Sequence, residues 1–540
     1  MFSFIFQLFI PFLFLLELAL HFSPCYKMLN KNGKASMYKI FLWAVIGIIS
    51  GTAHLHLLAE EKADKKEEGS ITLCLKEIIS ETKHQILINN IEIPYKAIAG
   101  NILLRNDQSK PKASISYIAY FKEEVLEPAA RPLIFCFNGG PGSSSIWLHV
   151  GVFGPRRVHL SDEGEGLFPY QVIDNPHSLL DLADLVFIDP ISTGYSRVAS
   201  GEDAKQFHGV DEDIESLGEF VRQFITQYER WNSPKLLAGE SYGTTRAAGL
   251  AGYLHDELNI YLNGMILISS VLNFQTLNDY NEGNDLPYPL YLPTYTATAW
   301  YHKKLGENLQ GDLGKTLEIV KDFALTDYTS ALMKGDSLSA HEYAKIVAQL
   351  ADYTGLSPEF IKKANLRISP QRFSKELLRA QGLIVGRFDS RFKGEALNPC
   401  NDYPSYDPSF DAIAGTFTAA FNQYIRKELK IKNDQEYKIL ANLHSTWNYS
   451  KYTNQFLNMS TALRNVMTQN KALKVFVGSG YYDLATPFFA TDYTFNHLRP
   501  ASDLRSRANI HYYPAGHMMY VQKSSLIKMK EDISRWMKKL

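Results

Sequence analysis

A serine lies in a short glycine-flanked motif that could make it a nucleophile. Residues 239–243 read Gly-Glu-Ser-Tyr-Gly, the G-x-S-x-G pattern, with Ser241 at its centre. An apolar run at 236–238 precedes the motif, and residues 244–254, rich in Ala and Gly, have the composition of a closely packed helix. This order of strand, sharp turn and helix presents a serine hydroxyl to a substrate. We therefore predict that Ser241 is a nucleophile beside the positive end of a helix.

A second glycine-rich segment could stabilise negative charge on a reacting oxygen. Residues 138–145 read Asn-Gly-Gly-Pro-Gly-Ser-Ser-Ser and follow an apolar run. A phosphate-binding loop is excluded, because the segment lacks the G-x-x-x-x-G-K-[ST] pattern and has no lysine. A plain turn is the simplest alternative. We favour an oxyanion hole formed by the backbone amides of Gly140 and Tyr242.

A nucleophilic serine needs a general base, and the base needs a carboxylate that orients it. When a G-x-S-x-G serine follows a strand, the chain order is serine, acid, histidine. Asp483 closes the segment 478–483 after a strand-like run, and His517 follows the next run at 510–513. Among 15 histidines, His497 and His511 are the competitors, and His511 falls inside a predicted strand. We predict that His517 is the base and Asp483 its acid.

Apolar runs separated by helical patterns indicate the scaffold that positions these residues. Apolar residues recur at helical spacing between 210 and 228. Continuous apolar strands that alternate with helices are typical of a parallel sheet covered on both faces. The strand-like runs are residues 133–137, 185–188, 236–238, 265–268, 473–477 and 510–513.

Strand-like runs are scarce between 291 and 462, where long helical stretches such as 337–353 and 412–429 prevail. We therefore predict an α/β-hydrolase fold: a mostly parallel central sheet flanked by helices, with an inserted, mainly helical cap. The core comprises 85–290 and 463–540, and the cap comprises 291–462. Ligands bind at the carboxyl ends of strands in such sheets, which is where the cap would lie.

Composition narrows the classes of ligand. The 540 residues carry 56 basic and 57 acidic side chains, and no basic stretch alternates with aromatics, so nucleic acid is not an expected partner. The four cysteines are far apart and form no C-x-x-C pair, so neither a metal site nor a dense disulfide framework is expected. We expect no organic cofactor. The sequence does not indicate an oligomeric state.

Residues 1–59 read as a leader. The apolar segment 40–50, with a basic start and small residues after it, predicts a secretory signal that is cleaved near Ala53 or Ala59. We expect that translation begins at Met28 or Met37. The alternative is a membrane anchor formed by the apolar segment 2–22, and membrane contact is expected only in that case. Residues 60–84 are predicted as a charged linker and the start of a mature, exported (periplasmic or secreted) chain.

Several motifs together resemble the serine carboxypeptidase family of α/β-hydrolases, peptidase family S10. They occur in family order and comprise residues 138–145, 189–196 (Asp-Pro-Ile-Ser-Thr-Gly-Tyr-Ser), 239–243, Asp483 and 516–518 (Gly-His-Met). The resemblance implies an acid-active exopeptidase that removes one residue from the carboxyl terminus of a peptide or protein through an acyl-enzyme. It also implies that Asn138, Gly139 and Glu240 bind the terminal carboxylate. A protonated glutamate could donate a hydrogen bond there, whereas an ionised one would repel the carboxylate.

The sequence departs from the family pattern at three places. Cys136 replaces a tryptophan, Ser143 replaces a disulfide-forming cysteine, and no acid occurs near Val152, where a second carboxyl group is expected. These departures leave two alternatives open for the hydrolase itself, an esterase or an acyltransferase on the same scaffold. A binding protein without catalytic activity is a third alternative, and Glu240 could simply brace the serine turn.

Overall fold

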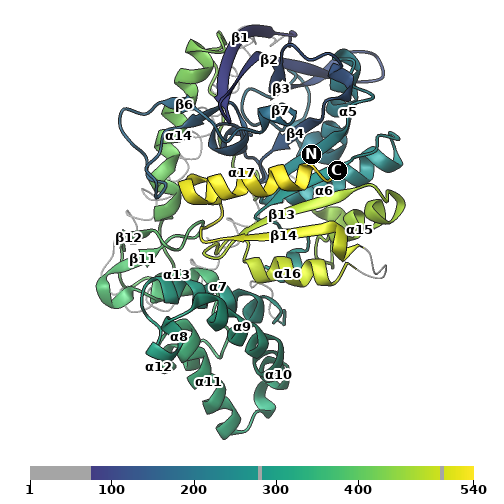
Figure 1. Ribbon diagram of the computed structural model, residues 1–540. Coiled ribbons are helices and arrows are strands. Elements are labelled where there is room, and N and C mark those ends of the chain that lie inside the picture. The colour runs from purple at the N-terminus through teal and green to yellow at the C-terminus, as the bar shows by residue number, and fades with distance from the viewer. Residues whose placement is uncertain (1–74, 278–282, 499–503) are drawn as a thin grey trace, which may run out of the picture. The chain divides into compact units, whose positions relative to one another are not determined.

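A ten-stranded sheet runs through the computed structural model, which describes residues 75–277, 283–498 and 504–540 (Figure 1). The strand order is β1-β2-β3-β7-β4-β9-β10-β13-β14, and β8 (Arg197–Val198) pairs with β3. The last six strands of this order are mutually parallel. They are β7 (Asp184–Ile188), β4 (Leu133–Phe137), β9 (Lys235–Glu240), β10 (Gly264–Ile268), β13 (Lys474–Gly480) and β14 (Ala508–Tyr513). The predicted mostly parallel sheet is confirmed.

Helices cover both faces of the parallel strands, because alternate strand residues point to opposite sides. In β4, Ile134 and Cys136 belong to one hydrophobic cluster, which also contains residues of α14 and α17. Leu133, Phe135 and Phe137 belong to the other cluster, with residues of α5, α6 and α15. These helices are α14 (Pro408–Lys427), α17 (Lys523–Met537), α5 (Val210–Gln227), α6 (Tyr242–Asp256) and α15 (Ser460–Gln469).

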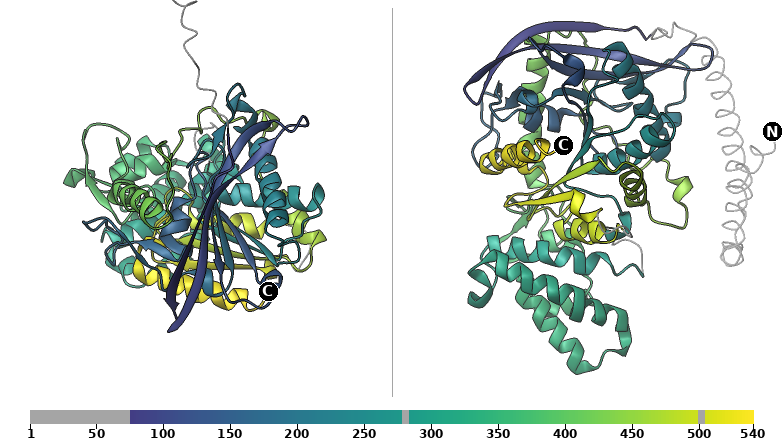
Figure 2. Two further views of the ribbon diagram at one scale, coloured as in Figure 1. Left: turned by 90° about the horizontal axis from the view of Figure 1, so that it is seen from above. Right: turned by 45° about the vertical axis from the view of Figure 1, so that its right-hand side comes forward.

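Three long antiparallel strands form one end of the sheet, drawn in purple in Figure 2. They are β1 (Ile79–Ile88), β2 (Ile91–Arg105) and β3 (Pro111–Lys122). The sequence analysis did not single them out, although Asn89 and Asn90 mark the first turn, where their φ angles are 51° and 62°. Because β1 begins at Ile79, the last residues of the segment assigned to the linker, 60–84, belong to the sheet.

The segment 291–462 contributes to two different parts of the fold. Helices α7 to α13 form a third hydrophobic cluster, which also includes buried residues between 482 and 490, and these helices lie apart from the sheet in Figure 1. In contrast, α14 packs with the sheet strands. The helices of the separate cluster are α7 (Pro287–Tyr301), α8 (Glu307–Gln310), α9 (Leu313–Phe323), α10 (Thr329–Lys334), α11 (Ala340–Thr354), α12 (Pro358–Lys363) and α13 (Pro370–Glu376). The division into core and cap at 291 and 462 stays a prediction.

Short elements complete the described ranges. They are α4 (Ile146–Leu148), the hairpin β5–β6 (Arg156–Val158, Val172–Asp174), the hairpin β11–β12 (Leu383–Val385, Lys393–Glu395) and α16 (Phe488–Asn496). Across these ranges, no helix combines the length and the hydropathy that crossing a bilayer requires. The predicted leader at 1–59 lies outside the described residues.

Candidate active site

Ser241 occupies a sharp turn between β9 and α6. Its φ of 60° and ψ of −130° are uncommon for a residue with a side chain. The turn brings neighbouring chain so close that the flanking positions require glycine. A Cβ on Gly239 would lie 2.2 Å from the carbonyl oxygen of Gly243, and a Cβ on Gly243 would lie 2.7 Å from that of Phe137. Ser241 is thus held at the carboxyl end of β9, at the start of a helix.

The imidazole of His517 is hydrogen-bonded to Asp483. Nδ1 of His517 lies 2.8 Å from Oδ2 of Asp483, and both side chains are almost fully buried. Asp483 follows β13 and His517 follows β14, the neighbouring parallel strand. A proton on Nδ1 leaves Nε2 of a neutral imidazole as a hydrogen-bond acceptor. The pair therefore has the arrangement that a general base and its orienting acid require.

The carboxylate of Asp483 is held by the residues that follow it. Oδ1 accepts the backbone amides of Ala485 and Thr486 at 2.8 and 2.9 Å, and Oδ2 accepts the Thr486 hydroxyl at 2.6 Å. That hydroxyl is also 3.2 Å from Nδ1 of His517. Thr486 therefore contacts both members of the pair, and sequence analysis did not identify it.

Residues distant in the sequence hold the main chain and ring of His517. Its amide donates to the carbonyl of Phe388 at 2.6 Å, and its carbonyl accepts the Ser269 hydroxyl at 2.6 Å. The Phe388 ring packs against the imidazole with 5.0 Å between ring centroids. Neither Phe388 nor Ser269 belongs to a sequence motif from which its role could have been predicted.

The two competing histidines lie in other surroundings. Nδ1 of His511, a residue of β14, lies 3.4 Å from Oδ2 of Asp532 on α17. Nδ1 of His497 lies 2.7 Å from the carbonyl oxygen of Tyr493, one helical turn earlier. These contacts account for both side chains as parts of the scaffold.

Ser241 and His517 follow strands at the same edge of the sheet, although no hydrogen bond joins their side chains within the described residues. The strands β9, β10, β13 and β14 are consecutive neighbours and parallel, so their carboxyl ends lie together. Glu240, the residue before Ser241, is near enough that its charge raises the pKa of His517. In enzymes without substrate, the bond between nucleophile and base is often long.

The pKa of His517 reflects opposing influences. Burial lowers it, but the charge and hydrogen bond of Asp483 and the charge of Glu240 raise it more, so that it lies above its usual value. Arg387 acts in the lowering direction. The imidazole is therefore a stronger base than a histidine in water.

The glycine-rich loop lies directly against the Ser241 turn. A Cβ on Gly139 would lie 2.4 Å from the amide nitrogen of Tyr242, and Gly140 has a φ of 103°. Within the described residues, the amides of Gly140 and Tyr242 donate to no carbonyl or side-chain oxygen. These two amides, predicted as an oxyanion hole, are thus free to bind a ligand atom.

A buried aspartate fixes the far end of this loop. Oδ1 of Asp189 accepts both the amide and the hydroxyl of Ser145 at 3.0 Å, and also the phenol of Tyr437 at 3.0 Å. Gly194 leaves room for the carboxylate, because a Cβ there would lie 1.8 Å from Oδ2. The segment 189–196 therefore positions the loop and does not itself reach Ser241 through any of these contacts.

Glu240 is buried, and its carboxyl group is hydrogen-bonded. Oε2 accepts a hydrogen bond of 2.6 Å from the phenol of Tyr520, a residue that sequence analysis missed. Burial raises the pKa of Glu240 to about 7, while His517 and hydrogen bonds from Tyr520 and Asn138 act against the increase. Oδ1 of Asn138 accepts the amide of Leu148 at 3.1 Å. Glu240 is therefore protonated at acid pH.

The departures from the family pattern are also visible. Val152, near which a second acid was expected, is buried in the hydrophobic cluster under the sheet, and Cys136 is a buried free thiol. In the described ranges, no three or more His, Cys, Asp and Glu side chains are grouped so that they could hold a metal ion.

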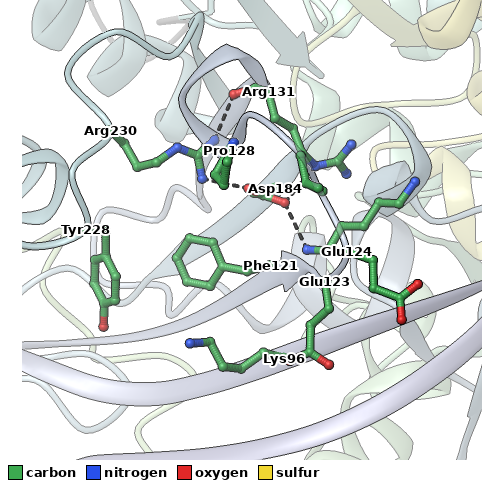
Figure 3. Close-up of a pocket in the computed structure, with 11 residues that line it drawn as sticks. Lys96, Phe121, Glu123, Glu124, Pro128, Arg131, Asp184, Tyr228 and Arg230 are labelled. Carbon is green, nitrogen blue, oxygen red and sulfur yellow. Dashed lines mark hydrogen bonds and ion pairs between the residues drawn. The ribbon is translucent and has the colours of Figure 1, made fainter.

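A cavity of about 370 Å³ lies at the opposite edge of the sheet, near the amino ends of β4, β7 and β9 (Figure 3). Three of the charged side chains that line it are bound to each other: Asp184 accepts Nε of Arg131 at 2.8 Å and Nη1 of Arg230 at 2.6 Å. Arg230 also donates to the carbonyl of Arg131 and to Ser233. We interpret this buried group as a structural brace and not as a ligand site.

The parallel sheet, the serine turn after β9 and the Asp483–His517 pair after β13 and β14 together define an α/β-hydrolase. The sequence model of the serine carboxypeptidase family matches residues 102–530. The chain therefore belongs to the serine carboxypeptidase family.

Individual relatives are distant. Serine carboxypeptidase-like 36 of Arabidopsis thaliana is 26% identical over 215 residues, which are 38% of this chain and 42% of that protein. Serine carboxypeptidase-like 34 of the same plant is 22% identical over 399 residues, 70% of each chain. The chain thus spans less than half of the first of these relatives. Kex1(delta)p, a prohormone-processing carboxypeptidase from Saccharomyces cerevisiae, has the same fold, with a TM-score of 0.52 at 16% identity over 82% of this chain and 91% of that one.

Proposed function

We propose that this protein is a serine-type carboxypeptidase that releases carboxyl-terminal residues from peptides at acid pH. The observation that supports this most directly is the hydrogen-bonded Asp483–His517 pair at the sheet edge where Ser241 follows β9. A serine next to a histidine that is hydrogen-bonded to an aspartate performs nucleophilic acyl transfer on several unrelated folds.

In the proposed mechanism, Oγ of Ser241 attacks the carbonyl carbon of the last peptide bond, and Nε2 of His517 takes the hydroxyl proton. The same nitrogen returns the proton to the leaving amine, and water then hydrolyses the acyl-enzyme by the reverse steps. Asp483 keeps the proton of the neutral imidazole on Nδ1. The amides of Gly140 and Tyr242 stabilise the oxyanion; losing one such donor costs about 3 kcal/mol of transition-state stabilisation.

We assign recognition of the terminal carboxylate to Asn138, Gly139 and Glu240. Support comes from the position of Glu240 next to the nucleophile and from its protonation below about pH 7. A protonated carboxyl group donates one hydrogen bond to the substrate carboxylate, whereas the ionised group repels it. Tyr520 stabilises the orientation of this glutamate by a hydrogen bond to Oε2.

A peptide ladder assay by mass spectrometry tests the proposal. Stepwise loss of carboxyl-terminal residues is expected from the wild type between acid and neutral pH, and none from Ser241→Ala. Ser337→Ala, which changes an exposed serine outside this site, is the matched control and should behave as the wild type. Internal cuts would contradict the carboxypeptidase assignment, and hydrolysis of small esters with intact peptide ends would contradict it in favour of the esterase alternative.

Export is also part of the proposal, and the pattern at 40–50 supports it. Amino-terminal sequencing of the mature protein should find a chain that begins near residue 53 or 59. A chain that retains the segment 2–22 in the membrane fraction would favour the anchor.

A further inference from the structure

An arginine without an ionic partner lies beside the candidate base. The side chain of Arg387 is exposed, and within the described residues it forms no salt bridge and donates no hydrogen bond. Its guanidinium carbon lies 5.1 Å from the centroid of the Phe388 ring. The same ring packs against His517 at 5.0 Å. One aromatic side chain thus contacts both the imidazole and an unpaired cation.

The main chain of Arg387 is fixed at this place. Its amide donates to Oδ1 of Asp407 at 3.1 Å, and its carbonyl accepts the amide of Leu484 at 3.0 Å. Leu484 directly follows Asp483, so the arginine is tied to the loop that carries the acid. The guanidinium is also near enough to act on the pKa of His517. These contacts place a positive charge next to the loop that carries Asp483, with the Phe388 ring between the guanidinium and His517.

Arg387 also borders a cavity of about 220 Å³. The other charged residue of the cavity, Asp407, is already hydrogen-bonded within the protein. The cavity is lined by residues of α13, β11 and the segment 404–407, including Asp407. The carboxylate of Asp407 accepts the amides of Arg387, Phe388 and Ser409 and the hydroxyl of Ser409. Four donors therefore disperse its negative charge, and Arg387 remains the cation available to a ligand.

We propose that Arg387 forms a subsite for an acidic side chain of the peptide substrate, next to the bond that is cleaved. This inference rests on the proposed carboxypeptidase function and specifies its substrate class. A guanidinium binds a carboxylate through two parallel hydrogen bonds, and contact with an aromatic face orients its plane. The Glu or Asp side chain can belong to the last residue or to the residue before it.

The test compares peptides that differ only in charge, at about pH 6, where a glutamate side chain is ionised. One series ends in Glu, Gln or Ala, and a second series carries these residues at the penultimate position. We expect the wild type to have a higher kcat/KM for Glu than for Gln at one position, by roughly two- to fivefold, because the pair is partly exposed. Added salt should reduce the ratio.

Two variants assign this preference to the arginine. Arg387→Gln should equalise Glu and Gln, and Arg387→Glu should invert the preference toward Lys. Arg372→Gln is the matched control, since Arg372 also lies over an aromatic ring, that of Tyr403 at 5.8 Å, and does not line this cavity. An unchanged Glu-to-Gln ratio in Arg387→Gln would overturn the inference. An equal loss for all peptides would instead assign the guanidinium to the terminal carboxylate and would also overturn it.

Failure of the proposed function gives a different result. If the wild type cleaves the Ala peptides, the carboxypeptidase assignment stands whatever the Glu-to-Gln ratio. If it cleaves none, calorimetric binding of N-acetylglutamate and N-acetylglutamine still tests the subsite, because binding needs no turnover. Tighter binding of the glutamate, lost in Arg387→Gln, would support the subsite, and equal binding would overturn it.

Discussion

Nδ1 of His517 lies 2.8 Å from Oδ2 of Asp483, and the two side chains are carried by loops that follow adjacent parallel strands. Thr486 contacts both groups, and Phe388 holds the amide of His517. The orientation of the imidazole is therefore set by at least three elements of the fold. Its consequences for activity can be measured.

Asp483→Asn should reduce kcat by about 10⁴-fold while the fold is retained, because an amide at this position favours the wrong imidazole tautomer. Hydrolysis of a small neutral ester measures the loss, and circular dichroism checks the fold. Asp532→Asn is the control, because it removes the carboxylate beside His511 instead. Wild-type turnover by Asp483→Asn would exclude the proposed role of the pair.

The pH profile should differ between peptides and esters. Glu240 is protonated below about pH 7 and ionised above it, so KM for peptides with a free carboxylate should rise by roughly tenfold per pH unit on the alkaline side. This rise in KM forms the alkaline limb of the pH profile for peptides, and neutral esters should lack it. Both substrates should lose activity at lower pH as His517 becomes protonated; because the charge of Glu240 is one cause that raises the pKa of His517, protonation of Glu240 moves this loss toward more acid pH. In Glu240→Gln the alkaline limb for peptides should be absent; a limb that persists would refute the assignment of Glu240.

Tyr520→Phe should move the alkaline limb for peptides to higher pH, by about one unit. The phenol's hydrogen bond favours the ionised form of Glu240, so its removal raises the pKa of Glu240 and extends the protonated range. The charged groups that also face Glu240 are His517 and Asp483, and both are retained.

Two further variants make this test specific. Gly151→Ala should shift the limb in the same direction, because a Cβ there would lie 2.6 Å from the Tyr520 ring and displace it. Tyr513→Phe removes a similar buried hydrogen bond, from a phenol to Asp532 at 3.1 Å, and should leave the profile unchanged. An unaltered profile in Tyr520→Phe would exclude its role in orienting Glu240.

Asp184→Ala should lower the free energy of unfolding by about 3 to 5 kcal/mol, because it leaves the buried guanidinium of Arg230 without its counter-charge. Urea denaturation at fixed pH measures the change. Asp174→Ala removes a carboxylate that is 63% exposed and ion-paired with Arg156, so it should cost less than about 1 kcal/mol. Equal effects of the two variants would contradict the interpretation of the cavity in Figure 3 as a structural brace.

Much of the parallel sheet could be predicted from local sequence. The apolar run at 133–137 coincides with β4, and the run at 265–268 differs from β10 by one residue. Strands buried on both faces are continuously apolar, which makes them easy to recognise. The strands β1 to β3 were missed because they mix polar and apolar residues; in β1 most positions are exposed or half-buried. Their pairing is visible locally only at the two turns, Asn89–Asn90 between β1 and β2 and residues 106–110 between β2 and β3.

The sequence by itself determined the serine turn and the order of the three candidate catalytic residues. The steric limit at Gly239 involves Gly243, a neighbour in the chain, so the local sequence already indicates it, whereas the limit at Gly243 comes from Phe137, which only the fold brings there. Only the tertiary structure decided the partners of these residues. Tyr520 donates a hydrogen bond to Glu240, which lies 280 positions earlier in the chain, and the Phe388 ring contacts both Arg387 and His517. Such contacts depend on how elements distant in the sequence pack together. Local residue spacing does not encode them, because each side chain is compatible with its own helix, strand or loop whether or not the partner is present.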